Sequence, residues 1–293
     1  MAGGVQSLVG SATVKLAAAR NWMRDPRKLP RDFVEPLVGA SALEIGGPSA
    51  WFRSGGKLPA YEVLGSIDGC NYAAGTLWGE AADDGVYAPE GTPRGRMFIL
   101  EAGDLGAIEP ESYDALLASH VIEHLANPIA AVREWRRVVR PGGHMLLVAP
   151  HKERTFDRRR PVTTLEHMIE DERSGTTEDD ETHFDEVLAL HDLSRDVGAR
   201  SDPAGFESRT RDNSRRRGVH HHVFVTETLL RVVDHCGLEI RAVHPRVPHD
   251  IFCLARRPAG GADPGDHAEP DNSSWLAADA AWRARSPFKL DRA

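Results

Sequence analysis

The sequence has few cysteines, no long apolar run and no excess of basic residues. Its three cysteines, Cys70, Cys236 and Cys253, are too few for a disulfide framework and lack CxxC spacing, which favours a reducing compartment. No apolar stretch approaches the roughly 20 residues needed to cross a bilayer, and the N-terminus lacks the apolar core of a signal peptide. A net charge of −8 argues against general nucleic-acid binding, which needs an excess of Lys and Arg. We therefore expect a cytoplasmic protein that binds neither membrane nor nucleic acid.

Length and composition favour one globular domain with appendages. The chain has 293 residues, of which 41% are hydrophobic and 27% charged, so it can bury a full core. We expect a helical lead-in over 1–40, a main domain over 41–257, an insertion in that domain over about 151–220, and a linker with a short C-terminal helix over 258–293. A mitochondrial presequence is the alternative for the lead-in, but acidic residues arrive early, between Asp25 and Glu35.

A glycine turn follows an apolar strand in the segment Leu43–Ser49. Gly46 and Gly47 let the backbone pass close to a bound molecule because neither has a Cβ, and Pro48 continues the turn. Glu44, just before the turn, can order it through backbone hydrogen bonds or fix a polar group of a ligand. Such turns hold nucleotide-like ligands, although a plain tight turn has the same pattern.

A second segment has the pattern of a strand–helix–strand unit. Residues 114–119 form an apolar strand that opens into a helix, and residues 130–139 carry apolar side chains at helical spacing. Arg140–Gly143 stops this helix before an apolar strand at 144–149. Such units fold as a parallel sheet with helices on both faces, and ligands bind beyond the carboxyl ends of the strands. In all, we expect strands at 42–46, 63–67, 97–100, 114–119, 144–149, 238–244 and 250–255.

The motifs Leu43–Gly47, Ser119–His124 and Arg140–Gly143 resemble, in order and spacing, those of the class I S-adenosylmethionine-dependent methyltransferases. The resemblance is strongest over residues 40–150, and the region after it is similar to a bacterial subgroup that modifies glycans or natural products. It implies an α/β fold with a Rossmann-like, seven-stranded, mostly parallel sheet and helices on both faces. A mostly helical or irregular insertion would follow the fifth strand. It also implies S-adenosylmethionine as cofactor and S-adenosylhomocysteine as product.

The resemblance implies cofactor contacts as well. Asp68, expected just after the second strand, would accept hydrogen bonds from the ribose, and Asp104 with Leu105 would bind adenine. Ser119 and His120 end the fourth strand, with His124 one turn further on. The full expected set is Glu44, Gly46, Gly47, Pro48, Asp68, Asp104, Leu105, Ser119, His120 and His124. The HxxEH order of His120–His124 is similar to a zinc pair, but the strand-to-helix turn already accounts for it.

Histidines are concentrated in the insertion, where seven of the 14 lie between His151 and His222. A hydroxyl that accepts a methyl group must lose a proton, and histidine is the usual base near neutral pH. We expect the base or a substrate ligand to be His183, His151 or one of the run around His221, with purely structural histidines as the alternative. A divalent metal is a less favoured alternative, with ligands His183, Asp185, His191 and Asp192.

Charge alternates along the insertion. Residues 154–160 are basic, residues 170–186 are strongly acidic, and residues 209–217 are basic again. These runs are either solvated faces, a lid whose opposite charges meet, or a pocket in which Arg side chains bind a phosphate or carboxylate of the acceptor.

We therefore predict an enzyme that moves the methyl group of S-adenosylmethionine to a hydroxyl of a sugar or polar natural product, by in-line displacement with histidine-assisted deprotonation. N- or C-methylation of a small molecule is one alternative, and it needs less help from a base. A catalytically inactive cofactor-binding scaffold is another, suggested by Gly47–Ser49 and the C-terminal appendage. The partner would be a small-molecule or glycan acceptor, and a homodimer through the C-terminal helix stays open.

Overall fold

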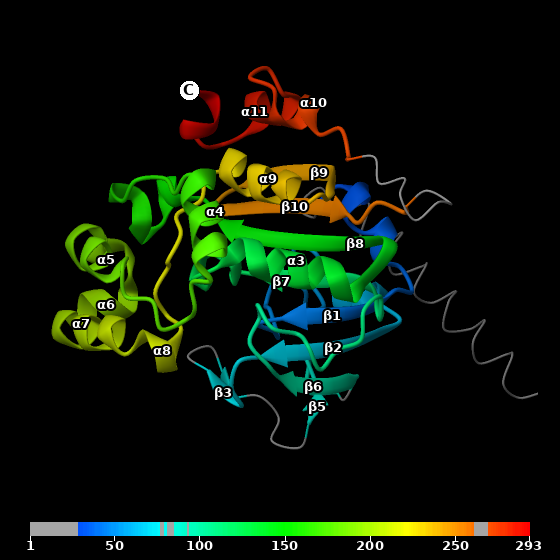
Figure 1. The fold of residues 1–293 in the computed structure, drawn as a ribbon, viewed down its shortest axis with the longest axis horizontal. Coiled ribbons are helices and arrows are strands. Elements are labelled where there is room, and N and C mark those ends of the chain that lie inside the picture. Colours follow the sequence, from blue (N-terminus) through cyan, green and yellow to red (C-terminus); the bar gives the residue numbers. More distant parts are fainter. Residues whose placement is uncertain (1–28, 77–78, 81–84, 93, 261–268) are drawn as a thin grey trace, which may run out of the picture.

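A twisted eight-stranded sheet forms the centre of the computed structural model, which describes residues 29–76, 79–80, 85–92, 94–260 and 269–293 (Figure 1). The strands, in their order across the sheet, are β5 (Val86–Tyr87), β6 (Gly95–Ile99), β2 (Ser66–Asn71), β1 (Ser41–Ile45), β7 (Tyr113–Ser119), β8 (Val139–Pro150), β10 (Asp250–Arg256) and β9 (Glu239–Arg246). Strands β6, β2, β1, β7 and β8 run parallel, whereas β10 is antiparallel to both of its neighbours. The Rossmann-like sheet is thus confirmed, with the short antiparallel β5 as an unpredicted eighth strand; a separate hairpin joins β3 (Gly75–Thr76) to β4 (Gly79–Glu80).

The predicted second strand is wrong in its bounds. Residues Ala60–Val63 form a short helix, α2, and β2 begins only at Ser66. Val63 and Leu64 are buried apolar residues, and a short apolar run does not distinguish a strand from the end of a buried helix. The shift matters for the site because it moves the carboxyl end of β2 from residue 67 to Asn71.

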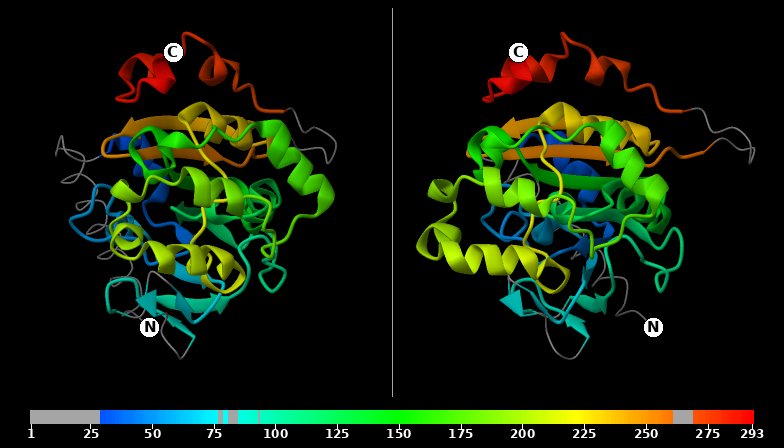
Figure 2. Two further views of the ribbon diagram at one scale, coloured as in Figure 1. Left: turned by 90° about the vertical axis from the view of Figure 1, so that its left-hand side faces the viewer. Right: turned by 60° about the vertical axis from the view of Figure 1, so that its left-hand side comes forward.

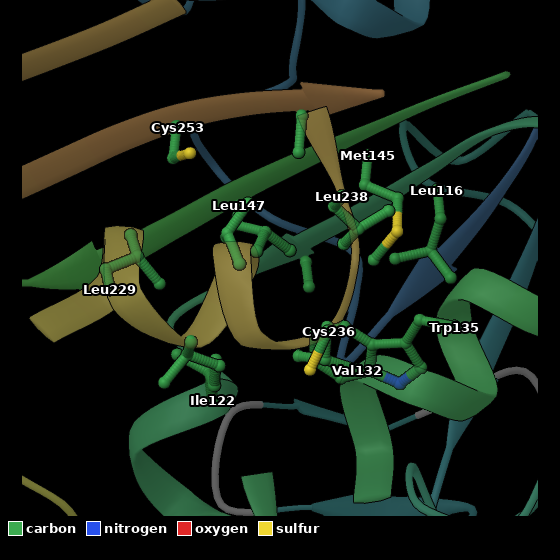
Figure 3. Close-up of a cluster of buried hydrophobic side chains, with 14 of the residues drawn as sticks. Leu116, Ile122, Val132, Trp135, Met145, Leu147, Leu229, Cys236, Leu238 and Cys253 are labelled. Carbon is green, nitrogen blue, oxygen red and sulfur yellow. The ribbon is translucent and has the colours of Figure 1, made fainter. Parts of the chain in front are cut away.

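Both faces of the sheet are covered by helices and apolar side chains. Alternation along β7 sends Leu116 into one core and Leu117 into the other. Helices α3 (Pro128–Val138) and α9 (Thr226–His235) cover the first face, where Trp135 is fully buried (Figure 3). The other face is covered by η1 (Arg31–Phe33), η2 (Glu35–Leu37) and α2.

The insertion between β8 and α9 is a series of short helices beside the carboxyl ends of the parallel strands, where the arrowheads of β1, β2 and β8 point (Figures 1 and 2). Its elements are η4 (Lys152–Arg154), η5 (Phe156–Arg159), α4 (Leu165–Ser174), α5 (Phe184–Leu190), η6 (Leu193–Arg195), α6 (Val197–Ser201), α7 (Pro203–Arg211) and α8 (Asn213–Arg216). Local side chains start several of them; for example, the Thr164 hydroxyl accepts from His167 N at the beginning of α4.

The C-terminal segment packs on the body of the same chain. Where one helix was expected, the structure has α10 (Ser273–Leu276), α11 (Ala281–Arg285) and η7 (Leu290–Arg292). Asn272 anchors the segment, because its side chain accepts from Ile240 N and donates to Leu238 O. Most of the expected lead-in, residues 1–28, and part of the expected linker, 261–268, lie outside the described residues. Within the described ranges, no helix combines the length and the apolar character that a membrane span requires.

Candidate functional site

A cleft of about 870 Å³ lies between the carboxyl ends of the parallel strands and the insertion. It is bounded by the turn after β1, by Ser119 and His120 at the end of β7, by Pro150 at the end of β8, and by His249 just before β10. A smaller pocket of about 70 Å³ continues it across the ends of β2 and β6, and the two share Gly46, His120 and His124. Ligands of open α/β sheets bind at this edge, so the cleft and the smaller pocket together form the candidate site.

Glu44 orders the turn after β1 from behind. Its carboxylate accepts hydrogen bonds from Ser49 N at 2.9 Å, from Tyr61 Oη at 2.7 Å and from Tyr87 Oη at 2.5 Å. The backbone bond to Ser49 agrees with the sequence prediction, whereas the fully buried side chain lines neither the cleft nor the smaller pocket. Burial raises the pKa of Glu44 to about 7, because desolvation outweighs the three hydrogen bonds to the carboxylate.

This raised pKa makes the stability of the protein depend on pH. The folded state binds a proton at Glu44 between its ordinary value of 4.5 and about 7, whereas the unfolded state has lost it. The contribution of Glu44 to the free energy of unfolding is therefore fully present below pH 4.5. Roughly 3 kcal/mol of it is lost as the pH rises through 7. The free energy of unfolding, measured by denaturant titration, should differ less between pH 5.5 and pH 7.5 for Glu44→Gln than it does for the wild type. If the two proteins show the same difference between the two pH values, Glu44 is not the source of this pH dependence.

Gly46 and Gly47 are both required by the geometry of the turn. Gly46 has a φ of +72°, which favours glycine, and a Cβ on it would lie 2.4 Å from Val121 Cγ2. A Cβ on Gly47 would lie 2.3 Å from Tyr87 Oη and 2.4 Å from the carboxyl carbon of Glu44. Asn71 fixes the turn from the other side, since its Nδ2 donates to Gly47 O at 2.9 Å.

Gly47→Ala should therefore destabilise the protein by about 1–3 kcal/mol, because the new methyl group displaces Tyr87 or Glu44 from a fully packed site. Gly103→Ala is the matched control, since nothing among the described residues lies within 4 Å of its added Cβ and its backbone is not left-handed. Thermal denaturation of both variants checks this expectation, and a Gly47→Ala midpoint equal to that of the control would refute it.

The structure corrects the prediction for Asp68. This residue lies inside β2 rather than after it, and its carboxylate accepts from Arg96 N at 2.6 Å and from Tyr113 Oη at 2.7 Å. Asp68 is therefore distant along the strand from the ligand edge. At the carboxyl end of β2 the smaller pocket is lined by Cys70 and Asn71, and by Tyr72 just after the strand.

Asp104 and Leu105 also lie outside the pocket lining. Asp104 is exposed and caps Gly106 N, while the buried Leu105 donates its backbone N–H to Glu134 Oε2 at 3.2 Å. The lining at the end of β6 comes from residues 100–102 instead. There Glu101 pairs with Arg217 of the insertion at 2.7 Å, and Arg217 pairs in turn with Glu178 at 2.8 Å.

His120 is held between two buried carboxylates at the end of β7. Its φ is +54°, its Nε2 lies 3.2 Å from Asp250 Oδ1, and its Nδ1 lies 3.4 Å from Glu123 Oε1. Burial alone would lower the pKa of His120, but hydrogen bonds and charge from Asp250 and Glu123 outweigh it and raise the pKa to about 9. The side chain is therefore a cation at neutral pH. Ser119 and His124 also line the cleft, as the sequence predicted for this turn.

His249 is the functional candidate that the sequence analysis missed. Its half-buried ring lines the cleft and stands edge-on to His120 with 5.8 Å between ring centroids. Burial lowers the pKa of His249, and the neighbouring cation of His120 adds to this against the opposing charge of Asp250. Its position in the sequence is the signal that could have found it. His249 immediately precedes the last strand, β10, and because β10 is antiparallel its amino end lies at the carboxyl edge of the parallel strands.

Of the histidines predicted as bases, His220 lines the cleft, with its Nδ1 2.6 Å from Asp157 Oδ2, whereas His151, His183 and His221 do not. His151 is fully buried under the C-terminal segment, with Nε2 3.1 Å from Asp291 Oδ1 and its ring stacked on Phe288. His221 is fully buried with Nε2 3.1 Å from the Asn213 amide, and His183 lies against His167. From the histidine-rich region only His191 and His220 line the cleft, and His120 and His249 lie outside that region.

The four residues of the less favoured metal alternative do not come together in the described structure. Asp185 is exposed and pairs with Arg211, Asp192 pairs with Arg158, and His191 lies 3.1 Å from Asp196. His183 instead groups with other histidines of the insertion.

The charge runs of the insertion meet one another, as the lid interpretation predicts. Arg160 from the first basic run pairs with Glu186 at 2.8 Å, and Arg217 from the second pairs with Glu178. Other arginines face the cleft, namely Arg154, Arg195, Arg209 and Arg216.

Comparison with known proteins gives one family match. The family model described as a methyltransferase domain matches residues 68–147. No protein of curated function matches the chain. Among solved structures, an S-adenosylmethionine-dependent methyltransferase from Mesorhizobium loti is similar at 14% identity and a TM-score of 0.46, covering 78% of this chain and 95% of that one. A second, from Methanosarcina mazei, is similar at 13% identity and a TM-score of 0.39, covering 75% and 92%.

Proposed function

We propose that the chain is a class I S-adenosylmethionine-dependent methyltransferase that methylates a hydroxyl oxygen of a sugar or another polar small molecule. The match of residues 68–147 to a methyltransferase domain and the mostly parallel sheet support the first part of this proposal. The observation that carries this proposal is the pair of His120 and His249 in the cleft. One ring is held as a cation and the other is neutral at pH 7, so a base faces the acceptor side. Buried free thiols at all three cysteines favour a cytoplasmic location for this enzyme.

The residues around the smaller pocket fit the cofactor. The Gly46 backbone at the end of β1 allows close approach, and Asn71 and Tyr72 offer polar groups where β2 ends. Glu101, at the end of β6, offers a carboxylate to ribose or amino groups. When bound, S-adenosylmethionine supplies an electrophilic methyl group on its sulfonium.

Arg217 must move for a nucleoside to enter this pocket. The pocket holds about 70 Å³, well below the roughly 300 Å³ of a typical ligand site, and the Arg217 side chain lines it between Glu101 and Glu178. Arg217 is also placed over the Tyr72 ring, 5.5 Å from its centroid. We infer that this part of the insertion opens for cofactor entry and closes over it.

The larger cleft suits a polar acceptor. Its lining combines histidines with Arg154, Arg195, Arg209 and Arg216, which favours an acceptor that carries a phosphate or carboxylate beside the hydroxyl. His249 accepts the hydroxyl proton as the oxygen attacks. Glu123 and Asp250 keep His120 cationic, and this positive charge helps to lower the pKa of His249. His249 is therefore neutral, and able to take a proton, before the oxygen attacks.

The test of the proposal is binding followed by product analysis on the full-length protein. We expect S-adenosylhomocysteine to bind in calorimetry, more weakly after Asn71→Ala and unchanged after Asp104→Ala. A screen of sugar phosphates and sugar acids with a ¹³C-labelled methyl donor should then yield an O-methyl resonance in NMR spectra. Labelled N- or C-methyl products would show instead that the enzyme methylates nitrogen or carbon. Cofactor binding with no product from any acceptor would favour the catalytically inactive scaffold.

A further inference from the structure

A cluster of histidines in the insertion has no part in the site described above. His167 lies on α4, His183 immediately precedes α5, and His222 lies on the segment that returns from the insertion to α9. Asp171 is one helical turn after His167. None of these four residues lines the cleft or the smaller pocket.

The three histidines of this cluster come close enough together to share one metal ion, and Asp171 lies beside His167. His167 Nε2 lies 3.1 Å from His183 Nε2 and 3.6 Å from Asp171 Oδ2. One ring nitrogen from each of the three histidines lies within 4.8 Å of the others. With Zn–N bonds of about 2.0–2.1 Å, tetrahedral ligand atoms are about 3.3 Å apart.

Two polar atoms of the cluster lack hydrogen bonds within the described part of the chain. They are Asp171 Oδ2 and Nδ1 of the fully buried His222. The Ala126 carbonyl, 3.2 Å from His222 Nε2, holds that ring from one side, which is the usual support of a metal-binding histidine.

Two other close groupings of histidines and acids in the described residues contain direct ion pairs. His120 lies between Glu123 and Asp250, and His220, beside His124, lies 2.6 Å from Asp157. The grouping around His167 brings three histidines from three segments of the insertion next to the Asp171 oxygen that has no donor among the described residues.

We propose that His167, His183, His222 and Asp171 bind one Zn²⁺ ion at a structural site that ties the insertion together. Three nitrogen ligands and one carboxylate favour zinc over magnesium or calcium, which prefer all-oxygen sites. His167 is exposed, so the ion can enter from solvent. The ion would join α4, the start of α5 and the segment before α9, and so fix the insertion over the cleft. This site is independent of the proposed acceptor chemistry.

The test is metal binding by the full-length protein, freed of metal with a chelator and titrated with ZnCl₂ in competition with a chromophoric chelator. We expect one Zn²⁺ per chain and a higher thermal midpoint after its addition. His167→Gln and Asp171→Asn should each weaken binding by about tenfold or more. His235→Gln, which changes a half-buried histidine of α9 outside the cluster, should leave it unchanged.

Cobalt provides a second readout that does not depend on enzyme activity. Co²⁺ in the wild-type protein should show the intense visible bands of a tetrahedral site, and His167→Gln should reduce them. His167 is exposed, so this variant should fold normally. Absence of stoichiometric Zn²⁺ binding, or equal binding by wild type, His167→Gln and Asp171→Asn, would overturn the proposal. So would loss of binding in Asp180→Asn alone, because it would move the ion to the neighbouring group of Asp180, His183 and His221.

Discussion

Arg160→Met should lower the free energy of unfolding by about 3–5 kcal/mol, the usual cost of leaving a buried charge without its partner. Arg160 is 1% exposed, and its guanidinium contacts Asp157 at 2.9 Å and Glu186 at 2.8 Å. It also donates to the carbonyls of His220 and His221, at 2.8 and 3.2 Å. Methionine has similar length but no donor, so Asp157 would stay buried beside His220 alone.

The buried carboxylate explains why the effect is large. The pKa of Asp157 lies at about 2 because the charges and hydrogen bonds of His220 and Arg160 overcome the desolvation that would raise it. Asp157→Asn in the Arg160→Met background should therefore recover part of the loss. Arg173→Met is the matched control, because Arg173 is exposed and its pair with Glu170, at 4.0 Å, contributes little. Urea titrations of the four proteins measure these differences, and equal losses for Arg160→Met and Arg173→Met would contradict the argument.

The sheet was predictable because its strands are short apolar runs between clear breaks. Residues 114–119 and 144–149 lie inside β7 and β8, and the glycine turn after β1 has the backbone that Gly46 suggested. The exception is β2, where apolar residues at the end of α2 look like a strand. The last two strands, expected at 238–244 and 250–255, are confirmed as β9 and β10, whereas β5, at two residues, is too short to leave a pattern.

The site was harder to predict because its residues meet only through the fold. His120 and Asp250 are 130 positions apart, and nothing local to either indicates the contact at 3.2 Å. His151 directly follows β8 and looked like a cleft residue, but Asp291, 140 positions later, turns its ring under the C-terminal segment. The turn after β1 could be placed because its glycines act locally, whereas burial of a histidine depends on every segment that packs over it.

His249→Gln should reduce turnover by about 10²–10⁴-fold while leaving the affinity for S-adenosylhomocysteine within about twofold of the wild type. Glutamine keeps much of the size and polarity of the ring but cannot take up the hydroxyl proton. Binding should be spared because His249 lines the acceptor cleft and not the smaller pocket. Single-turnover kinetics with the acceptor found in the screen, together with calorimetry, measure both quantities.

The pH profile separates this role from a structural one. His249 must be neutral to act as a base, so the rate should fall as the pH drops through its pKa, which burial sets below the usual 6.5. The positive charge of His120 helps to keep the pKa of His249 low, so His120→Gln should move this acidic limb to higher pH. His244→Gln is the control, because this histidine of β9 is also half-buried with a lowered pKa but lies outside the cleft lining. Wild-type turnover in His249→Gln would rule out His249 as the base, and a parallel loss of turnover and cofactor affinity would assign it a structural role.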